Sequence, residues 1–155
     1  MDVKQTTFTG KHYLVWRKTI EMKNIGDKNM RDSAFKFVYA YIQKNNLTLQ
    51  GAWSALYFTR DEESGTTDMA IGMPISEMVE ITDSELSLVS VAEAKAVSVT
   101  VYGSYDQLQT AHKAIRDYLK ANNLEATITV EEYNVTGMDT SLPSEWQTTI
   151  YYLLA

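Results

Sequence analysis

The stretch Tyr41-Ile42-Gln43-Lys44-Asn45-Asn46-Leu47 returns later in the chain as Tyr118-Leu119-Lys120-Ala121-Asn122-Asn123-Leu124. In both copies a tyrosine and an aliphatic residue come first, two other residues follow them, and Asn-Asn-Leu ends the stretch. Because asparagine tolerates the left-handed conformation in which many helices end, each copy predicts the end of a helix. The copies lie almost half the chain apart, which indicates one structural unit present twice.

Apolar residues before each copy repeat at the spacing of an amphipathic helix. In the second half they are Leu108, Ala111, Ile115, Tyr118 and Leu119. Ser104 and Gln107 predict a capping box at the start of this helix. The first-half helix is expected over about residues 30–45, with a buried stripe of Phe35, Val38, Tyr39 and Ile42.

Runs with the two-residue alternation of strands surround each helix. One run precedes the helix and two follow it in each half: 13–20, 52–60 and 68–74, then 96–102, 127–134 and 146–154. Both halves therefore spell β-α-β-β, over about residues 3–75 and 88–155, and residues 76–88 are expected to be a linker.

Two such units can join edge to edge. We predict one domain over residues 1–155, of the α+β class, in which the duplicated β-α-β-β units form one curved antiparallel sheet. The helices are expected on one face and a ligand cleft on the other, between the two pseudo-repeats. A sheet face without helices must hold water or a ligand, so function is expected there.

Composition narrows the class of protein. The chain has 155 residues, 45% of them hydrophobic, which suits a single globular domain. Its formal net charge of -6 repels phosphate backbones, so direct nucleic-acid binding is not expected. There is no apolar run of the ~20 residues that span a bilayer and no signal-peptide pattern, which predicts a cytoplasmic protein without membrane contact. A homodimer or a protein partner is left open.

The sequence carries none of the usual motifs of nucleotide-binding proteins, serine hydrolases or zinc proteases. It has no cysteine, and neither His12 nor His112 has a metal-ligand partner at a useful spacing. We therefore expect no metal and no cofactor, and we expect His112 to be a partly packed surface residue. Too few residues precede the first strand for a DNA-binding helix-turn-helix, so a complete transcription regulator is not expected.

Strand alternation predicts which side chains face the cleft. In the second half the aliphatic Ile128 and Val130 are expected under the helices, so that Thr129, Glu131 and Tyr133 share the open face. A slip of one residue would exchange Glu131 for Glu132. In the first half Leu56 and Phe58 are expected under the helix, and the residues predicted to face the cleft are Trp53, Ala55 and Tyr57.

The predicted cleft is thus walled by aromatic rings and contains one carboxylate. Aromatic faces attract cations and apolar rings, at about 0.5–2 kcal/mol per contact. A buried carboxylate either has a raised pKa or awaits a cationic partner. The alternative, given equal weight, is that Trp53, Tyr57 and Tyr133 are ordinary core residues and Glu131 is a surface residue.

The order of several short motifs resembles the GyrI-like, or bacterial effector-binding, superfamily. The residues that carry the resemblance are Gly103-Ser104-Tyr105, Glu131-Glu132-Tyr133 and Glu145-Trp146-Gln147-Thr148-Thr149-Ile150. Members of that superfamily include ligand domains of multidrug-responsive regulators, gyrase-modulating proteins and stand-alone drug-binding proteins. In the drug-binding members a glutamate on the strand before the final hairpin meets the positive charge of the ligand, a role that the resemblance gives to Glu131.

The chain departs from that pattern in two places. Family sequences usually show Asn-Asp-Pro in the hairpin and Thr-Glu-Ile on the last strand, where this chain has Asn134-Val135-Thr136-Gly137 and Thr148-Thr149-Ile150. The carboxylate missing at Thr149 puts the preferred charge of the ligand in doubt.

Two functions of different class remain. The first is reversible binding of amphipathic, cationic aromatic compounds by Glu131, Tyr133, Trp53, Tyr57, Trp16, Tyr105 and Trp146. The second is a hydrolase of reactive small-molecule toxins, in which Glu131 activates a water and Tyr133 or Tyr105 binds the leaving oxygen. Because no second acid–base group is visible beside Glu131, binding without catalysis is favoured. A protein-interaction module of the gyrase-inhibitor type is a third possibility.

Overall fold

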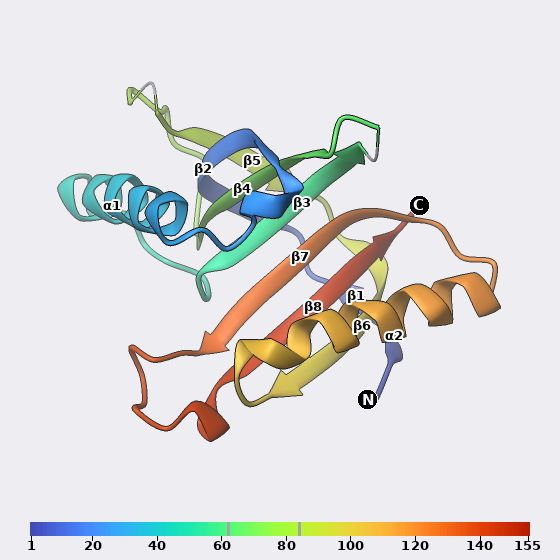
Figure 1. The fold of residues 1–155 in the computed structure, drawn as a ribbon. Coiled ribbons are helices and arrows are strands. Elements are labelled where there is room, and N and C mark those ends of the chain that lie inside the picture. Colours follow the sequence, from blue (N-terminus) through green and yellow to red (C-terminus); the bar gives the residue numbers. More distant parts are fainter. Residues whose placement is uncertain (62, 84) are drawn as a thin grey trace. The chain divides into compact units, whose positions relative to one another are not determined.

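In the computed structural model the chain folds as two units, each with one long helix and four antiparallel strands (Figure 1). The structure describes residues 1–61, 63–83 and 85–155. Unit 1 consists of Met1–Thr9 and Glu93–Ala155, and unit 2 of Gly10–Ala92. Glu62 in the predicted first-half hairpin loop and Ser84 in the predicted linker lie outside the described residues.

Both helices end at the repeated Asn-Asn-Leu, as predicted. Helix α1 spans Lys28–Lys44 and helix α2 spans Leu108–Ala121. In each copy the first asparagine is the C-cap, and its side-chain amide donates to the carbonyl of the tyrosine four residues before it, at 3.0 and 2.9 Å. The second asparagine has a positive φ, 51° at Asn46 and 54° at Asn123. The helix end that the sequence repeats is therefore one structure built twice.

The strands lie where alternation predicted them, with their ends shifted by a few residues. In unit 2 the sheet order is β3-β4-β2-β5, with bounds Ser54–Asp61, Thr66–Ile75, Lys11–Glu21 and Ser87–Val91. In unit 1 the order is β1-β6-β8-β7, with bounds Lys4–Phe8, Ala94–Tyr102, Gln147–Leu154 and Ala126–Val135. Three short 3-10 helices, Met22–Asn24, Tyr105–Gln107 and Pro143–Glu145, complete the described elements. The α+β class and the antiparallel pairing are confirmed.

Two short strands were not predicted, and they exchange places between the repeats. Strand β1 precedes the first β-α-β-β run, yet it pairs with β6, the first strand of the second run. Strand β5 precedes the second run and pairs with β2, the first strand of the first run. Residues 76–88, predicted to be a linker, therefore end inside β5. Each unit thus obtains its edge strand from the other repeat.

Each helix covers one face of its own sheet. Helix α2 buries Ala111, Ile115 and Leu119 against β6 and β8, with Leu108 and Tyr118 partly buried beside them. The predicted stripe of α2 is confirmed. Helix α1 packs on β2 and β4 through Ala34, Val38, Tyr41 and Ile42.

The predicted stripe of α1 was wrong at one position. Tyr39 is 53% exposed, and Tyr41 is buried in its place and donates a hydrogen bond to the carbonyl of Glu80. Val38, Tyr41 and Ile42 follow the three- and four-residue steps of the buried face, whereas Tyr39 lies about 100° around the helix from Val38.

The predicted capping box at Ser104 is also wrong. The Ser104 hydroxyl donates to the carboxylate of Asp106 at 2.5 Å and makes no bond to the helix backbone. Tyr105–Gln107 forms a 3-10 turn before α2 begins, so the helix starts at Leu108, four residues beyond the serine. None of the described helices is long and apolar enough to cross a bilayer.

In unit 1 the predicted orientation of β7 is reversed. Helix α2 covers the face that carries Val97, Val99 and Ile150. Glu131 stands directly opposite Ile150 in the pairing of β7 with β8, and directly opposed side chains point to the same face. Glu131 therefore points toward α2, and Glu132 points to the opposite face.

In unit 2 the predicted orientation of β3 is reversed as well. Ala55 stands opposite Ile71 on β4, which lies on the same face as Met73 in the cluster under α1. Trp53, Ala55 and Tyr57 are therefore on the α1 face, and Leu56 is on the other. The physical reason is the same in both units. Alternation predicts the helix-covered face only when the other face is exposed, whereas here Leu56 and Val130 are both 0% exposed on that other face.

Candidate functional site

A hydrogen-bonded chain of four side chains links β7, α2 and β8 in unit 1. The His112 Nε2 atom lies 3.0 Å from Glu131 Oε1, and the His112 Nδ1 atom lies 2.7 Å from the Tyr152 hydroxyl. The Tyr133 hydroxyl donates to Glu131 Oε2 at 3.1 Å. The Glu131 side chain is 8% exposed and that of His112 is 18% exposed. Both carboxylate oxygens of this buried glutamate thus have a partner, as a buried charge requires.

His112 is partly packed, as expected, but its ring faces inward rather than toward solvent, and the sequence held the signal for this orientation. His112 lies four residues after Leu108 and three before Ile115, both of which pack in the cluster under α2. That spacing places the imidazole on the buried face of the helix. A histidine inside an apolar stripe requires a polar partner on the strand below it, and Glu131 is that partner.

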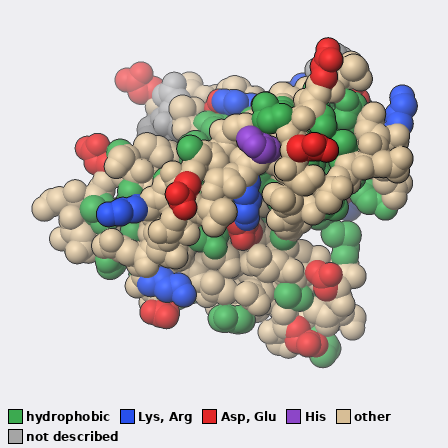
Figure 2. Space-filling view, turned by 180° about the vertical axis from the view of Figure 1, so that it is seen from behind, with side chains coloured by type: hydrophobic (Ala, Val, Ile, Leu, Met, Phe, Trp, Pro, Cys, Tyr) green, Lys and Arg blue, Asp and Glu red, His purple; other side chains and the backbone are tan. Residues whose placement is uncertain are grey.

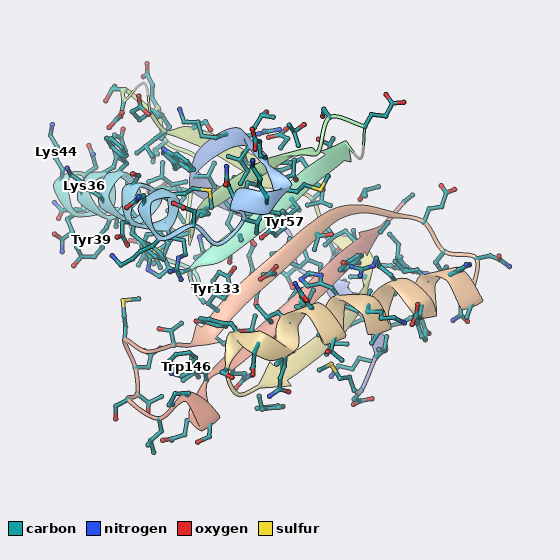
Figure 3. The ribbon with its side chains drawn as sticks, viewed as in Figure 1. Lys36, Tyr39, Lys44, Tyr57, Tyr133 and Trp146 are labelled. Atoms are coloured by element: carbon teal, nitrogen blue, oxygen red, sulfur yellow. The ribbon has the colours of Figure 1, made fainter. Side chains whose placement is uncertain are left out.

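Two further aromatic rings lie beside these four hydrogen-bonded side chains. The Tyr105 ring is 5.9 Å from that of Tyr133 and 5.1 Å from that of Trp146. Figure 3 shows Tyr133 and Trp146 at the same end of the unit 1 sheet. The structure therefore brings together four of the predicted site residues, Glu131, Tyr133, Tyr105 and Trp146, on the side of the sheet that α2 covers.

The three other predicted residues belong to unit 2. Trp53 packs edge-on against Phe35 of α1, with ring centroids 4.5 Å apart. Trp16 is partly buried against the α1 cluster, and Tyr57 lies on the same face of that sheet. Trp16 also lines an open hollow of about 390 Å³ with Ile20, Glu21, Asn24, Asp27 and Met30.

The opposite face of the unit 1 sheet carries a carboxylate that was considered only as an alternative. Glu132 is 9% exposed and pairs across the strands with Thr149. Tyr151 shares this face, since it stands opposite Val130, and its ring meets that of Phe8 edge-on at 5.2 Å. A carboxylate, two aromatic rings and an aliphatic side chain thus lie on one face.

A row of polar groups continues from Glu132 along the same face. The Asn134 amide donates to Glu132 Oε2 at 3.5 Å, and the Thr149 hydroxyl donates to Asn134 Oδ1 at 2.9 Å. The hydroxyls of Thr149 and Thr100 are 3.3 Å apart. Thr149 stands at the position for which the sequence resemblance predicts a glutamate, and Glu132 is the carboxylate of this row.

The negative charge of Glu132 affects the pKa of the Tyr151 phenol. Burial first, and then the negative charge of Glu132, raise the pKa of Tyr151 above its usual value of 10.0. Sequence alternation missed Tyr151 and Phe8. Tyr151 was missed because Tyr151 and Tyr152 place one tyrosine on each face of the strand, so alternation does not distinguish them. Phe8 was missed because the strand that carries it was not predicted.

Within the described part of the chain, no three His, Asp or Glu side chains are grouped closely enough to hold a metal ion. The partners that the site offers to a ligand are therefore aromatic rings, hydroxyls, one amide and carboxylates.

Comparison with known proteins gave likeness of structure only. No protein-family model matches the sequence, and no curated protein sequence matches it. The chain superimposes on the crystal structure of the EcmrR C-terminal domain with a TM-score of 0.80 and 15% identity, over 99% of this chain and 97% of that one. It superimposes on SAV2435 bound to tetraphenylphosphonium with a TM-score of 0.73 and 13% identity, over 100% and 94% of the two chains. The chain shares their fold.

Two further structures show how varied the proteins with this fold are. In the cryo-EM structure of the EcmrR–DNA complex, this chain spans 57% of the length of the EcmrR chain. A hydrolase from Listeria innocua encoded by lin2189 has a TM-score of 0.62 at 9% identity. At these identities the fold alone is shared, and function has to be argued from the site. Membership of the GyrI-like superfamily stays a prediction.

Proposed function

We propose that this chain binds small molecules that carry a positive charge on an aromatic body, and that Glu132 meets that charge. The observation that carries the proposal is the position of Glu132, nine-tenths buried on the face opposite α2 and beside the Tyr151 ring. A carboxylate in such surroundings attracts a cation more strongly than one in water, because the local dielectric constant is lower.

The rings on this face suit the rest of such a ligand. Tyr151 presents aromatic surface next to the carboxylate, and the buried Phe8 ring supports it edge-on from behind. A ligand cation over an aromatic ring gains about 0.5–2 kcal/mol, and a stacked ring gains a similar amount. Tetraphenylphosphonium, the compound bound to SAV2435, combines a positive charge with four phenyl rings and is a model ligand of this chemistry.

Glu132 suits this role better than Glu131 does. Both oxygens of Glu131 already accept hydrogen bonds, from His112 and from Tyr133, under helix α2. A ligand would have to pass beneath that helix to reach Glu131, whereas Glu132 lies on the opposite face of the sheet. The role that the family resemblance gives to Glu131 is therefore proposed for its neighbour. Tyr133 holds Glu131 through its hydroxyl, and Tyr105 and Trp146 stack beside Tyr133 rather than meeting the charge.

The structure bears on the hydrolase alternative in two opposite ways. His112 is the second acid–base residue that the sequence did not reveal beside Glu131. However, both ring nitrogens of His112 already face a partner, and Tyr152, the partner on Nδ1, is only 8% exposed. A catalytic base must reach the proton that it removes. This arrangement favours a structural role for the pair, so binding is the function that we propose.

The test is a calorimetric titration with tetraphenylphosphonium and with triphenylphosphine oxide, a neutral aromatic compound. We expect saturable binding of the cation, and Glu132→Gln should weaken it about 10–100-fold, which corresponds to about 1.4–2.8 kcal/mol. Glu131→Gln is the matched control and should change affinity less than threefold. Equal binding of the neutral compound, or a larger effect of Glu131→Gln, would contradict the proposal.

A further inference from the structure

The loop between β7 and β8 displays large apolar side chains at one end of unit 1. Met138 is 76% exposed and Leu142 is 56% exposed, and both lie in the loop that leads to Trp146, the residue before β8. Tyr105, 36% exposed, stacks obliquely on the Trp146 ring at 5.1 Å. We call Tyr105, Met138, Leu142 and Trp146 the loop patch. Clustered exposed apolar residues on a soluble protein usually mark an interaction site.

The loop is held in one shape by its own hydrogen bonds. The Thr136 amide donates to the Asp139 carboxylate at 2.9 Å, and the Leu142 amide donates to the Thr140 hydroxyl at 3.3 Å. The Trp146 indole donates to the Thr140 carbonyl at 3.4 Å. An apolar surface that is already ordered costs a partner less conformational entropy on binding.

The backbone of the loop also closes around the indole. A Cβ atom built on Gly137 would lie 3.4 Å from a carbon of the Trp146 ring, so the chain passes close to it. Met138 follows Gly137 directly, so its backbone lies one residue from this close approach. The four side chains of the loop patch come from two segments, the turn at Tyr105 and the loop.

The surroundings of the loop patch carry negative charge. Asp106, Asp139 and Glu145 lie in these two segments, and the sequence has no lysine or arginine in residues 102–107 or 134–147. Figure 2 shows hydrophobic and acidic side chains interspersed at the end of unit 1 that carries this loop, at the lower right. The rim of the surface thus repels acidic partners and attracts basic ones.

We infer that the loop patch is a docking surface for a basic amphipathic segment of a partner protein, with apolar side chains on Met138, Leu142 and the two rings and lysines or arginines on the acidic rim. The inference is independent of the proposed ligand site, which uses Glu132, Tyr151 and Phe8 on strands of the sheet. A failure of one leaves the other standing.

The experiment uses fluorescence anisotropy with a labelled 18-residue peptide of leucines and lysines in helical alternation, and the same peptide with glutamates for lysines. Wild type should bind the lysine peptide and not the glutamate peptide. Met138→Ser with Leu142→Ser should weaken binding at least tenfold. The matched control is Met78→Ser with Leu49→Ser, a methionine and a leucine exposed by 60% and 43% in unit 2, which should leave affinity unchanged.

Each other outcome overturns the inference. No saturable binding by wild type up to millimolar peptide removes the docking surface, and an equal loss in both double variants makes the binding non-specific. Charge is tested by Asp106→Asn with Glu145→Gln, which should reduce the salt dependence of binding. Sedimentation is run on wild type and the patch variant, and a dimer that the patch variant abolishes would show that the occupant is a second copy of the chain.

Discussion

Replacing His112 by alanine should destabilise the protein far more than replacing its other histidine. The substitution leaves the Glu131 carboxylate, 8% exposed, with Tyr133 as its remaining partner among the contacts that link it to α2 and β7. Leaving a buried charged group short of a hydrogen-bond partner costs more than the about 1–3 kcal/mol that a neutral group loses. Because the His112 side chain is 18% exposed, water can reach part of the space left behind, and we expect a loss of about 2–4 kcal/mol.

The assay is equilibrium unfolding in urea at neutral pH, followed by tryptophan fluorescence. With a slope of about 2 kcal/mol per molar urea, the expected loss moves the midpoint by roughly 1–2 M. His12→Ala is the matched control. The His12 Nδ1 atom lies 2.8 Å from the Ser90 hydroxyl in an exposed setting, so this variant should lose about 0.5–1 kcal/mol.

A double variant separates the hydrogen bond between His112 and Glu131 from the packing of their side chains. Replacing both groups by apolar residues, His112→Leu with Glu131→Met, removes the uncompensated charge, so it should cost about 2 kcal/mol less than the sum of the two single variants. Additive effects, or equal losses for His112→Ala and His12→Ala, would refute the account of this pair as a buried, mutually dependent unit.

Two further predictions follow from single positions. Burial and the charge of Glu132 raise the pKa of Tyr151 in the folded state, so the folded protein holds this proton more tightly than the unfolded chain. The free energy of unfolding should therefore fall as the pH rises above about 10, and it should fall less in Tyr151→Phe. Ultraviolet difference titration should show a lower Tyr151 pKa in Glu132→Gln. Gly72→Ala should prevent stable folding of unit 2, because the new Cβ would overlap the Leu14 carbonyl oxygen and lie 2.8 Å from Val15 Cα. Gly137→Ala is the control, and it should change the urea midpoint little because its Cβ would meet its neighbours at ordinary contact distances. A folded Gly72→Ala protein with an unchanged midpoint would contradict the close approach of β2 and β4.

Local signals were sufficient for the elements. Asn45-Asn46 and Asn122-Asn123 ended helices where the repeat predicted, because the left-handed conformation is a preference of the residue itself. Six of the eight described strands followed from alternation, which depends only on neighbouring residues, whereas β1 and β5 were missed. The buried stripe of α2 was predicted correctly for the same reason. In α1 the prediction chose Tyr39 for the buried face, where the structure has Tyr41, two residues later.

The site was less predictable because it depends on which face each helix covers. Alternation placed Glu131 and Glu132 on opposite faces correctly, but the aliphatic Val130 suggested the wrong face for the helix. Strand pairing decides this point, through Ile150 opposite Glu131. The same reversal in β3 shows that the error is systematic for sheets that bury side chains on both faces.

By itself, the sequence determined the α+β class, the duplicated β-α-β-β order, the ends of both helices and the presence of two adjacent glutamates on strand β7. These properties are set by residue preferences and by periodicity within one element. Only the tertiary structure decided that Glu131 is tied to His112 and Tyr152 under α2, that Glu132 stands beside Tyr151, and that β1 and β5 are exchanged between the repeats. Those facts depend on contacts between residues far apart in the chain, for which no local pattern carries a preference.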